Sequence, residues 1–186
     1  NWQHLGIPPI EVAVNVSARQ FRQHDFRQTV QAALEESDLR PEWLVLELTE
    51  STIMHNPEQA AGVLRELKDM GVRISIDDFG TGYSSLSYIR RFPIDSIKID
   101  RSFVKDIASN PDDAAIAGAV VAMAHSMKKR VTAEGVETLD QLEFLESLGC
   151  DEMQGYFVSE PIPADRFEQL VRTHRPWGRS DCRKAA

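Results

Sequence analysis

The sequence predicts an α/β fold in which a parallel sheet curves toward a barrel, and two features of its pattern indicate this. First, six strand-like runs recur along the chain and are separated mostly by helical runs, which implies a parallel sheet with helices outside it. Second, one face of these strands is apolar and the other carries small or polar residues. A flat, doubly wound sheet needs two apolar faces, whereas a barrel turns one face inward.

The predicted strands are short runs in which apolar and polar residues alternate. They span residues 11–17, 44–50, 72–77, 94–100, 130–134 and 152–158. The third strand ends in two adjacent carboxylates, Asp77 and Asp78, followed by a Gly-rich turn. Successive strand side chains point to opposite faces, so a regular strand cannot aim both aspartates at one point. We therefore expect the pair to lie where the strand ends and the backbone bends.

Helical runs fill the gaps between strands, and several of their caps are visible in the sequence. An Asn-Pro pair opens two of them, at 56–57 and at 110–111, because Asn caps a helix and Pro suits its first turn. Thr138 with Gln141 resembles the capping box that opens another helix. The glycines at 71 and 149 are expected to end helices. Further helical runs are expected at about 26–37, at about 84–90 as a short turn, and from Pro163 to about His174.

The composition is that of one globular domain. The length of 186 residues allows a sizeable core, with 42% hydrophobic and 27% charged residues. No apolar run approaches the roughly 18 residues of a membrane helix, and residues 1–4 show no signal-peptide pattern. Cys150 and Cys182 lack metal-binding spacing, which favours free thiols in a reducing cytoplasm.

The charge balance restricts the partners. The chain has 21 Lys and Arg against 29 Asp and Glu, a net charge of −8. This balance argues against nucleic-acid binding through a basic face. An anionic substrate would therefore need a cation brought with it.

The face of the strands that carries small and polar residues places a functional group near the C-terminal end of each strand, the rim where barrels of this kind hold their active sites. These groups are Asn15, Glu47, Asp77, Lys98, Glu134 and Gln154. The carboxylates, with the amide oxygen of Asn15, form an all-oxygen ligand set that suits Mg²⁺ or Mn²⁺ and does not suit zinc. With Asp78 they are too many for one small cation, so we expect two metals bridged by an aspartate. Lys98 would hold a phosphate oxygen or the attacking water.

Each of these residues also has a simpler interpretation when taken alone. Residues 77–82 could be an Asp-rich turn with glycines at positive φ. Asn15 could be a turn former, Lys98 a solvated strand end, and Asp100 the cap of the turn at 101–103. The two glutamates could be exposed or salt-bridged. Six strands that deliver polar groups at matching height and on the same face favour a shared site instead.

Six runs, in order and with compatible spacing, resemble the EAL-domain family, which consists of cyclic di-GMP phosphodiesterases. They are NVSARQF at 15–21, ELTES at 47–51, DDFGTGYSSL at 77–86, KID at 98–100, AEGVE at 133–137 and QGY at 154–156. The resemblance covers about residues 1–174. It implies a TIM-like (β/α)₈ barrel and metal-dependent hydrolysis of cyclic di-GMP to linear pGpG, with two Mg²⁺ or Mn²⁺ ions.

The resemblance also implies a role for each matching residue. Metal ligands are implied at Asn15, Glu47, Asp77, Asp78 and Glu134, with Asp77 as the bridge. Lys98 is implied to position the nucleophilic water, and it forms the expected catalytic set with Asp77 and Glu134. Gln154, Glu137 and Asp100 are expected near the substrate, and Glu50 is expected to steady the loop after Asp78.

One departure from the family pattern concerns the N-terminal side. The Glu-Ala-Leu tripeptide that names the family is absent, and Trp2–Pro9 match the helix before the family's third strand. We therefore expect two strands and about two helices to be missing, so that about six strands form an incomplete barrel with open edges. The 186-residue chain alone is expected to be inactive or weakly active.

Two alternatives remain open: an inactive EAL-type module that binds cyclic di-GMP and signals, or a metal-dependent barrel enzyme acting on another phosphate ester. We expect the domain to span residues 1–174 and a disordered polar tail to span 175–186. The expected partners are cyclic di-GMP, a second copy of the chain and upstream regulatory domains, through which the full-length protein could be tethered to a membrane. Neither nucleic-acid binding nor direct membrane insertion is expected.

Overall fold

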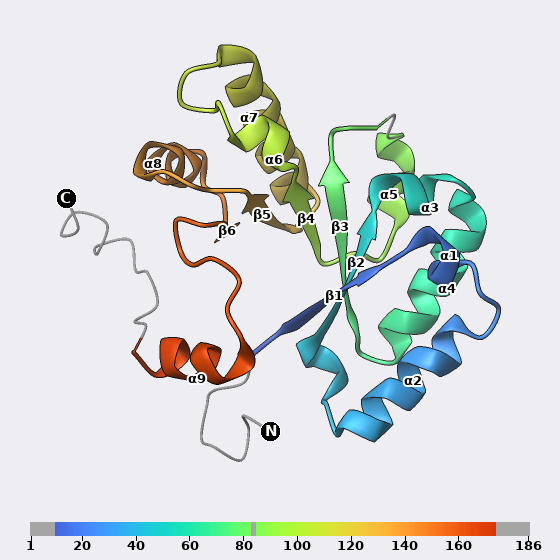
Figure 1. The fold of residues 1–186 in the computed structure, drawn as a ribbon. Coiled ribbons are helices and arrows are strands. Elements are labelled where there is room, and N and C mark those ends of the chain that lie inside the picture. The colour runs from blue at the N-terminus through green and yellow to red at the C-terminus, as the bar shows by residue number, and fades with distance from the viewer. Residues whose placement is uncertain (1–9, 83–84, 174–186) are drawn as a thin grey trace. The chain divides into compact units, whose positions relative to one another are not determined.

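Six strands form one parallel sheet whose spatial order follows the chain (Figure 1). The computed structural model describes residues 10–82 and 85–173. The strands are β1 (Val12–Val16), β2 (Leu44–Thr49), β3 (Arg73–Phe79), β4 (Ser96–Ile99), β5 (Arg130–Glu134) and β6 (Glu152–Gln154). The predicted alternation of strands and helices around a parallel sheet is confirmed. The expectations for Trp2–Pro9, Cys182 and the tail at 175–186 lie outside the described residues.

Helices follow nearly every strand. They are α1 (Ala18–Phe21), α2 (Phe26–Ser37), the 3₁₀ helix η2 (Pro41–Trp43), α3 (Glu50–Met54), α4 (Pro57–Asp69), α5 (Leu86–Arg91), α6 (Arg101–Val104), α7 (Pro111–Ser126), α8 (Leu139–Leu148) and α9 (Ala164–Thr173). The predicted caps are confirmed: Asn56 and Asn110 accept backbone N–H groups of α4 and α7, and Thr138 with Gln141 forms both bonds of a capping box. Within the described ranges, no helix combines the length and the apolar character that crossing a membrane requires.

The sheet curls, as contacts between non-neighbouring strands show. Residues Glu11–Val158 form one compact unit that contains all six strands. Arg130, at the start of β5, approaches Glu11, just before β1, with 3.6 Å between Nη2 and Oε2. In a flat sheet, four strand spacings would separate these positions by roughly 19 Å. The polar face of the sheet is therefore concave, and the six strands form an incomplete barrel.

The outer face of the sheet carries the core. Leu48, Ile76 and Ile97 have no exposed surface, and on the outer layer Leu64 of α4 is equally buried. Helices α3 and α4 contact β3, and α7 contacts β4 and β5, so the helices lie on the convex side of the curl (Figure 1).

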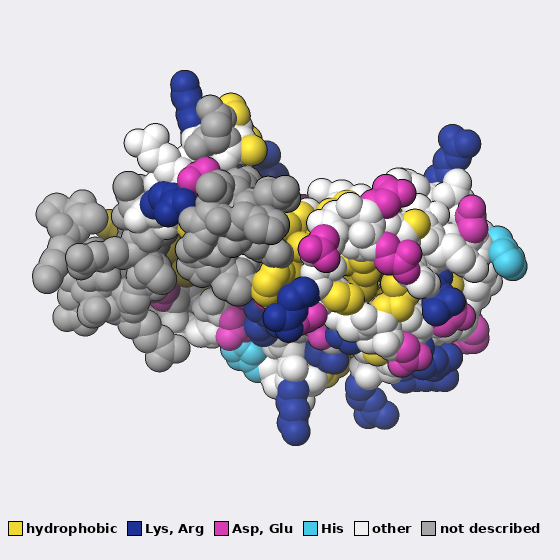
Figure 2. Space-filling model, turned by 90° about the horizontal axis from the view of Figure 1, so that it is seen from below, with side chains coloured by type: hydrophobic (Ala, Val, Ile, Leu, Met, Phe, Trp, Pro, Cys, Tyr) yellow, Lys and Arg dark blue, Asp and Glu magenta, His cyan; other side chains and the backbone are white. Residues whose placement is uncertain are grey.

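The edge strand β1 is the exception to this burial. Val12 and Val14 belong to the apolar face but remain 38% and 43% exposed. The face of the molecule in Figure 2 shows hydrophobic side chains at the surface, with acidic and basic side chains interspersed around them.

Several elements differ from the sequence-based expectation. Strand β3 continues through Phe79 instead of ending at Asp77. Strand β6 ends at Gln154 instead of residue 158, because the following Gly155 packs directly on the backbone of Val136. The short helix α3 begins at Glu50, which we expected to end a strand, and α6 replaces the turn expected at 101–103. Helix α1 lies in a segment for which we stated no expectation. Helix α9, in a second unit that includes residues 159–173, begins after Pro163 as expected, with Phe167 N–H donating to Pro163 O.

Candidate functional site

A β-bulge explains how two consecutive aspartates serve one site. Ile76 of β3 pairs with Ile97 of β4, but the next pair is Phe79 with Ile99, so β3 holds one extra residue. Asp78 takes up the extra length in a left-handed backbone conformation, with φ of +53°. Its N–H donates to Oδ1 of Asp77 at 3.1 Å. Bulges re-aim side chains in this way, so the backbone bend expected at this pair lies within the strand.

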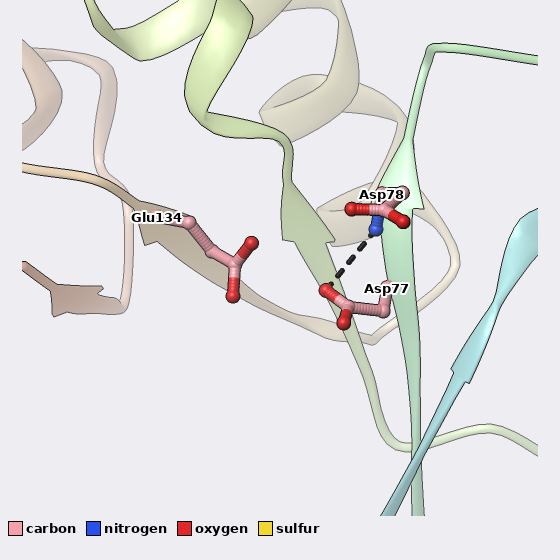
Figure 3. A group of neighbouring side chains, drawn as sticks. All are labelled: Asp77, Asp78 and Glu134. Carbon is pink, nitrogen blue, oxygen red and sulfur yellow. Dashed lines mark hydrogen bonds between the residues drawn. The ribbon is translucent and has the colours of Figure 1, made fainter. Parts of the chain in front are cut away.

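Three carboxylates meet at this bulge. One oxygen each from Asp77, Asp78 and Glu134 can be chosen so that all lie within 4.8 Å of one another. Figure 3 shows the carboxylate of Glu134 extending from β5 toward the two aspartates of β3. The predicted convergence of strand ends is thus present for these three residues. Such a set of hard oxygen donors fits a divalent cation of the Mg²⁺ or Mn²⁺ type.

Lys98 connects a fourth carboxylate to this cluster. Its side chain on β4 is almost fully buried, at 4% exposure. Nζ lies 2.5 Å from Oε1 of Glu134, 2.9 Å from Oε1 of Glu47 and 3.4 Å from Oδ1 of Asp77. The alternative of a solvated strand end for Lys98 is therefore wrong, and the glutamates on β2 and β5 are salt-bridged within the concave face.

The electrostatics reflect one cation shared by several carboxylates. Burial lowers the pKa of Lys98, but the hydrogen bonds that its ammonium donates to Glu134 and Glu47 outweigh this effect, so the pKa lies above its ordinary value. Burial raises the pKa of Glu134 despite the opposing effect of Lys98, and the charges of Asp77 and Glu47 add to the rise. Burial, Asp77 and Asp100 likewise raise the pKa of Asp78. Negative charge is thus crowded beyond what one lysine compensates, and a divalent cation would relieve it.

Two further predicted residues lie on strands beside the cluster. Asn15 is the register partner of Glu47, and Gln154 is the register partner of Glu134. Both side chains are exposed. The sheet therefore places them next to the cluster along the hydrogen-bonding direction, while their roles as metal ligand and substrate contact stay predictions.

Asp100 follows β4 and caps α6. Its Oδ1 accepts the N–H of Ser102 at 2.9 Å and the Ser102 hydroxyl at 2.5 Å. Burial alone would raise the pKa of Asp100, but these two hydrogen bonds outweigh it and hold the pKa below its usual range. The alternative of a helix cap is confirmed. Asp100 also interacts with Asp78, so the cap borders the cluster.

Glu50 lies under the loop that follows the bulge. It is 3% exposed and its Oε2 accepts the N–H of Gly80 at 3.2 Å. Gly82 is so close that an added Cβ would lie 2.5 Å from Oε1 of Glu50. These contacts lie where a loop-supporting residue is expected, and a side chain at position 82 would displace the Glu50 carboxylate.

A pocket of about 290 Å³ opens beside the cluster. Its walls include Glu134 together with the expected substrate residues Glu137 and Gln154. It is also lined by Arg101 and Tyr156, which our sequence analysis did not assign to the site. Their positions in the sequence could have indicated them as site residues, because Arg101 directly follows the KID motif and Tyr156 is the last residue of QGY.

Comparison with known proteins identifies a family and several relatives of this chain. A family model described as EAL domain matches residues 1–161. The bifunctional diguanylate cyclase/cyclic di-GMP phosphodiesterase MucR of Pseudomonas aeruginosa is 46% identical over 166 residues, which are 89% of this chain and 24% of MucR. The cyclic di-GMP phosphodiesterase NbdA of the same species is 45% identical over 173 residues, which are 92% of this chain and 22% of NbdA. The chain thus spans about a quarter of either relative's length.

Solved structures match the fold. A complex of the PaMucR phosphodiesterase with c-di-GMP gives a TM-score of 0.87 at 45% identity, covering 89% of this chain and 67% of that chain. The EAL domain of Mycobacterium smegmatis DcpA gives 0.88 at 38% identity, covering 94% and 78%. Klebsiella pneumoniae BlrP1 in complex with manganese and cy-diGMP gives 0.78 at 34% identity, covering 86% and 41%. The curled sheet is therefore an incomplete TIM-like barrel of the type found in these structures.

Proposed function

Because the chain belongs to the EAL domain family, we propose that it carries the catalytic residues of a metal-dependent phosphodiesterase that hydrolyses cyclic di-GMP to linear pGpG. MucR and NbdA, which resemble it over about nine-tenths of its length, are named for cyclic di-GMP phosphodiesterase activity. The observation that carries the proposal is the group of Asp77, Asp78 and Glu134 at the bulge in β3.

The residues present fit divalent cations. The carboxylates of Asp77, Asp78 and Glu134 crowd negative charge, and burial of Asp78 and Glu134 raises their pKa values, so bound cations would stabilise the ionised forms. We propose that these three residues, with Glu47 and the amide oxygen of Asn15, hold two Mg²⁺ or Mn²⁺ ions. Such ions supply an activated water and screen the charge that develops on a phosphodiester.

The chain's own residues would orient the substrate around these ions. Lys98 would place a positive charge beside the phosphate or the attacking water, from a position fixed by burial and by Glu47 and Glu134. Asp100, Glu137 and Gln154 would contact the bound nucleotide. Glu50 would hold the loop after Asp78 through the N–H of Gly80.

The test compares the complete natural polypeptide with its Asp77→Asn variant. With cyclic di-GMP and Mg²⁺ or Mn²⁺, we expect chromatography to show pGpG from the wild type. We expect a loss of about 100-fold or more from the variant, because ligand shells tune affinity and activity on this scale. A chelator should abolish wild-type turnover. Asp69→Asn, the same chemical change at the exposed end of α4, serves as the control and should leave turnover unchanged.

Three outcomes would contradict this proposal. Retained hydrolysis in Asp77→Asn would remove the bridging role of this carboxylate. Calorimetric binding of cyclic di-GMP without product, in the presence of either metal, would identify a binding module instead of an enzyme. Hydrolysis of other phosphate esters in preference to cyclic di-GMP would identify the other alternative, a metal-dependent barrel enzyme acting on another phosphate ester.

The remaining proposals concern the surroundings of the site. We infer a cytoplasmic location, a homodimer and additional regulatory domains in the complete protein. The last inference is supported by relatives about four times as long as the matched region. We also keep residues 1–174 as the proposed extent of the domain, somewhat beyond the family match at 1–161.

A further inference from the structure

Helix α8 begins with a buried glutamine, unlike the glutamines at the same position of two other helices. Gln141 is the third residue of α8 and is 6% exposed. Gln20 of α1 and Gln59 of α4 are also third residues, but both are exposed, and their side chains bond to Ser17 and Asn56, three positions earlier. Burying an amide is costly unless its polar atoms are paired, so the partners of Gln141 indicate what it does.

The Gln141 side chain connects two segments of the chain. Its Oε1 accepts the N–H of Thr138 at 3.0 Å, which is the bond of a capping box, and also the N–H of Glu137 at 2.7 Å. Its Nε2 donates to the carbonyl oxygen of Lys105 at 2.8 Å. A capping box requires only the bond to Thr138. The other two bonds tie residues 135–138, which we name the β5–α8 turn, to the end of α6.

These two segments follow the strands that carry Lys98 and Glu134. Helix α6 begins after β4, and its cap Asp100 borders the carboxylate cluster. The β5–α8 turn follows β5, and Glu137 lines the pocket beside Glu134. Gln141 does not belong to the described lining of that pocket. Its bonds therefore reach the site through these two segments.

Backbone contacts hold the other end of the β5–α8 turn. Gly135 has a φ of +71°, and an added Cβ would lie 2.7 Å from Cβ of Arg101, so this end packs directly on the start of α6. Val136 has no exposed surface, and its N–H and C=O both bond to the backbone in and just after β6. Without the Gln141 side chain, the N–H of Glu137 loses its acceptor. The Glu137 end of the turn can then shift while the Gly135 end stays fixed.

We propose that Gln141 is a positioning residue for the carboxylate of Glu137, an inference that rests on the proposed function. It holds the backbone of Glu137 at a fixed distance from α6, and this places the carboxylate at the pocket wall beside Glu134. A misplacement of about 1 Å in a site of this kind can cost roughly 100-fold in rate. Gln141 acts through Glu137 and is not itself a catalytic residue.

The first test does not depend on activity. Amide hydrogen exchange of the complete natural polypeptide is followed by mass spectrometry in the peptide that contains Glu137 and Thr138. Gln141→Met keeps the length of the side chain and removes its amide, so we expect exchange in this peptide to accelerate about 10-fold. Gln59→Met, the same change at the third residue of α4, is the matched control and should leave this peptide unchanged. Unchanged exchange in Gln141→Met would refute the inference.

The second test measures kcat/KM for cyclic di-GMP, with single-turnover assays for slow variants. We expect Gln141→Met to lower kcat/KM by about 10- to 100-fold, and Gln59→Met to leave it unchanged. Glu137→Gln should also lower it. If Gln141 acts through Glu137, adding Gln141→Met to Glu137→Gln should cost less than about 3-fold more. A merely structural role would instead reduce kcat/KM by the same factor in both backgrounds.

Thr138→Ala controls for the loss of the helix cap. It removes the bond from the Gln141 N–H to Thr138 Oγ1, at 3.3 Å, and keeps the bonds of the Gln141 side chain. We expect a lower melting temperature but a change in kcat/KM of less than about 3-fold. A loss in Thr138→Ala as large as that in Gln141→Met would show that the cap alone matters, and would refute the positioning role.

The outcomes separate this inference from the proposed function. If the wild type hydrolyses cyclic di-GMP but Gln141→Met or Glu137→Gln turns over as fast as the wild type, the positioning role is refuted and the proposed function stands. Equal losses from Gln141→Met in both backgrounds refute it as well. If the wild type does not hydrolyse cyclic di-GMP, the proposed function fails and the positioning role fails with it. All assays are run where circular dichroism shows each variant to be fully folded.

Discussion

Asp78 illustrates at the residue scale how the fold accepts local strain to build the site. Its left-handed backbone is uncommon for a residue other than glycine, although aspartate tolerates it better than most. Burial and the charge of Asp77 both raise the pKa of Asp78 and so disfavour its ionised form. No packing advantage offsets these costs, since Asp78 is only partly buried. Strain that persists without a packing gain is typical of functional sites.

Cys150 gives a prediction about reactivity at the same scale. Burial raises the pKa of its thiol to about 11, and Sγ contacts the carbonyl oxygens of Val131 and Glu152. Because burial disfavours the thiolate, the group stays protonated until the pH approaches that value. In a Cys182→Ser background, alkylation at pH 8 should be about 100-fold slower than for an ordinary thiol, and should accelerate as the pH rises.

The measurement is the iodoacetamide rate between pH 7 and 10, followed by mass spectrometry of the peptide that contains Cys150. The same protein in denaturant provides the reference rate for an unburied thiol. Equal rates in the native and denatured protein at pH 8 would show that the thiol is not shielded.

The sequence predicted which residues form the site better than it predicted their backbone conformations and contacts. The pattern of strand ends indicated Asp77, Lys98 and Glu134, because period-two alternation fixes which side chains share a face. It could not indicate the left-handed state of Asp78, which depends on how β3 pairs with β4 around the bulge. The ion pairs of Lys98 with carboxylates from three strands could not be predicted either, because they also depend on the curl of the sheet.

At the scale of elements, long strands and helices were predictable and the short ones were not. Helix α1 is four residues long, yet Ser17 and Gln20 form a complete capping box that the sequence displays. That signal could have found it. The end of β6 had no comparable local signal, because Gly155 turns where the backbone of Val136 approaches it, and this contact joins two separate strands.

The junction between Gly155 and Val136 can be tested with a pair of glycine substitutions. Gly155→Ala should destabilise the protein by roughly 1–3 kcal/mol, because its Cβ would lie 2.1 Å from Val136 O and backbone must move. Gly62→Ala is the matched control: no atom lies within 4 Å of its added Cβ, and it is inside α4. That change should stabilise by about 0.5–1 kcal/mol. Thermal unfolding of both variants decides, and equal melting temperatures would contradict the packing argument.

On the scale of the whole molecule, a second charged layer lines the concave face at the opposite end of the strands from the carboxylate cluster. Glu11 pairs with Arg73 and Arg130, and Arg130 also pairs with Glu152. These residues come from the starts of β3, β5 and β6 and from the residue before β1. These pairs could not be predicted from the sequence, since their partners are far apart in the chain. Arg130 and Glu152 lie on adjacent strands, whereas the pairs of Glu11 with Arg73 and Arg130 also require the curvature of the sheet.

The pair of Glu11 and Arg130 provides the last prediction, because it forms only if the sheet curls. A double-mutant cycle with Glu11→Gln and Arg130→Gln should yield a coupling free energy of about 0.5–1 kcal/mol from chemical denaturation, the size expected for partly exposed ion pairs. The coupling should weaken in 1 M salt, where the screening length is about 3 Å. A control cycle of Glu11→Gln with Arg65→Gln should show none, since Arg65 lies on α4. Zero coupling for the first cycle at low salt would mean that β1 and β5 do not face each other in solution, and that the barrel-like curvature which gathers the carboxylates is lost.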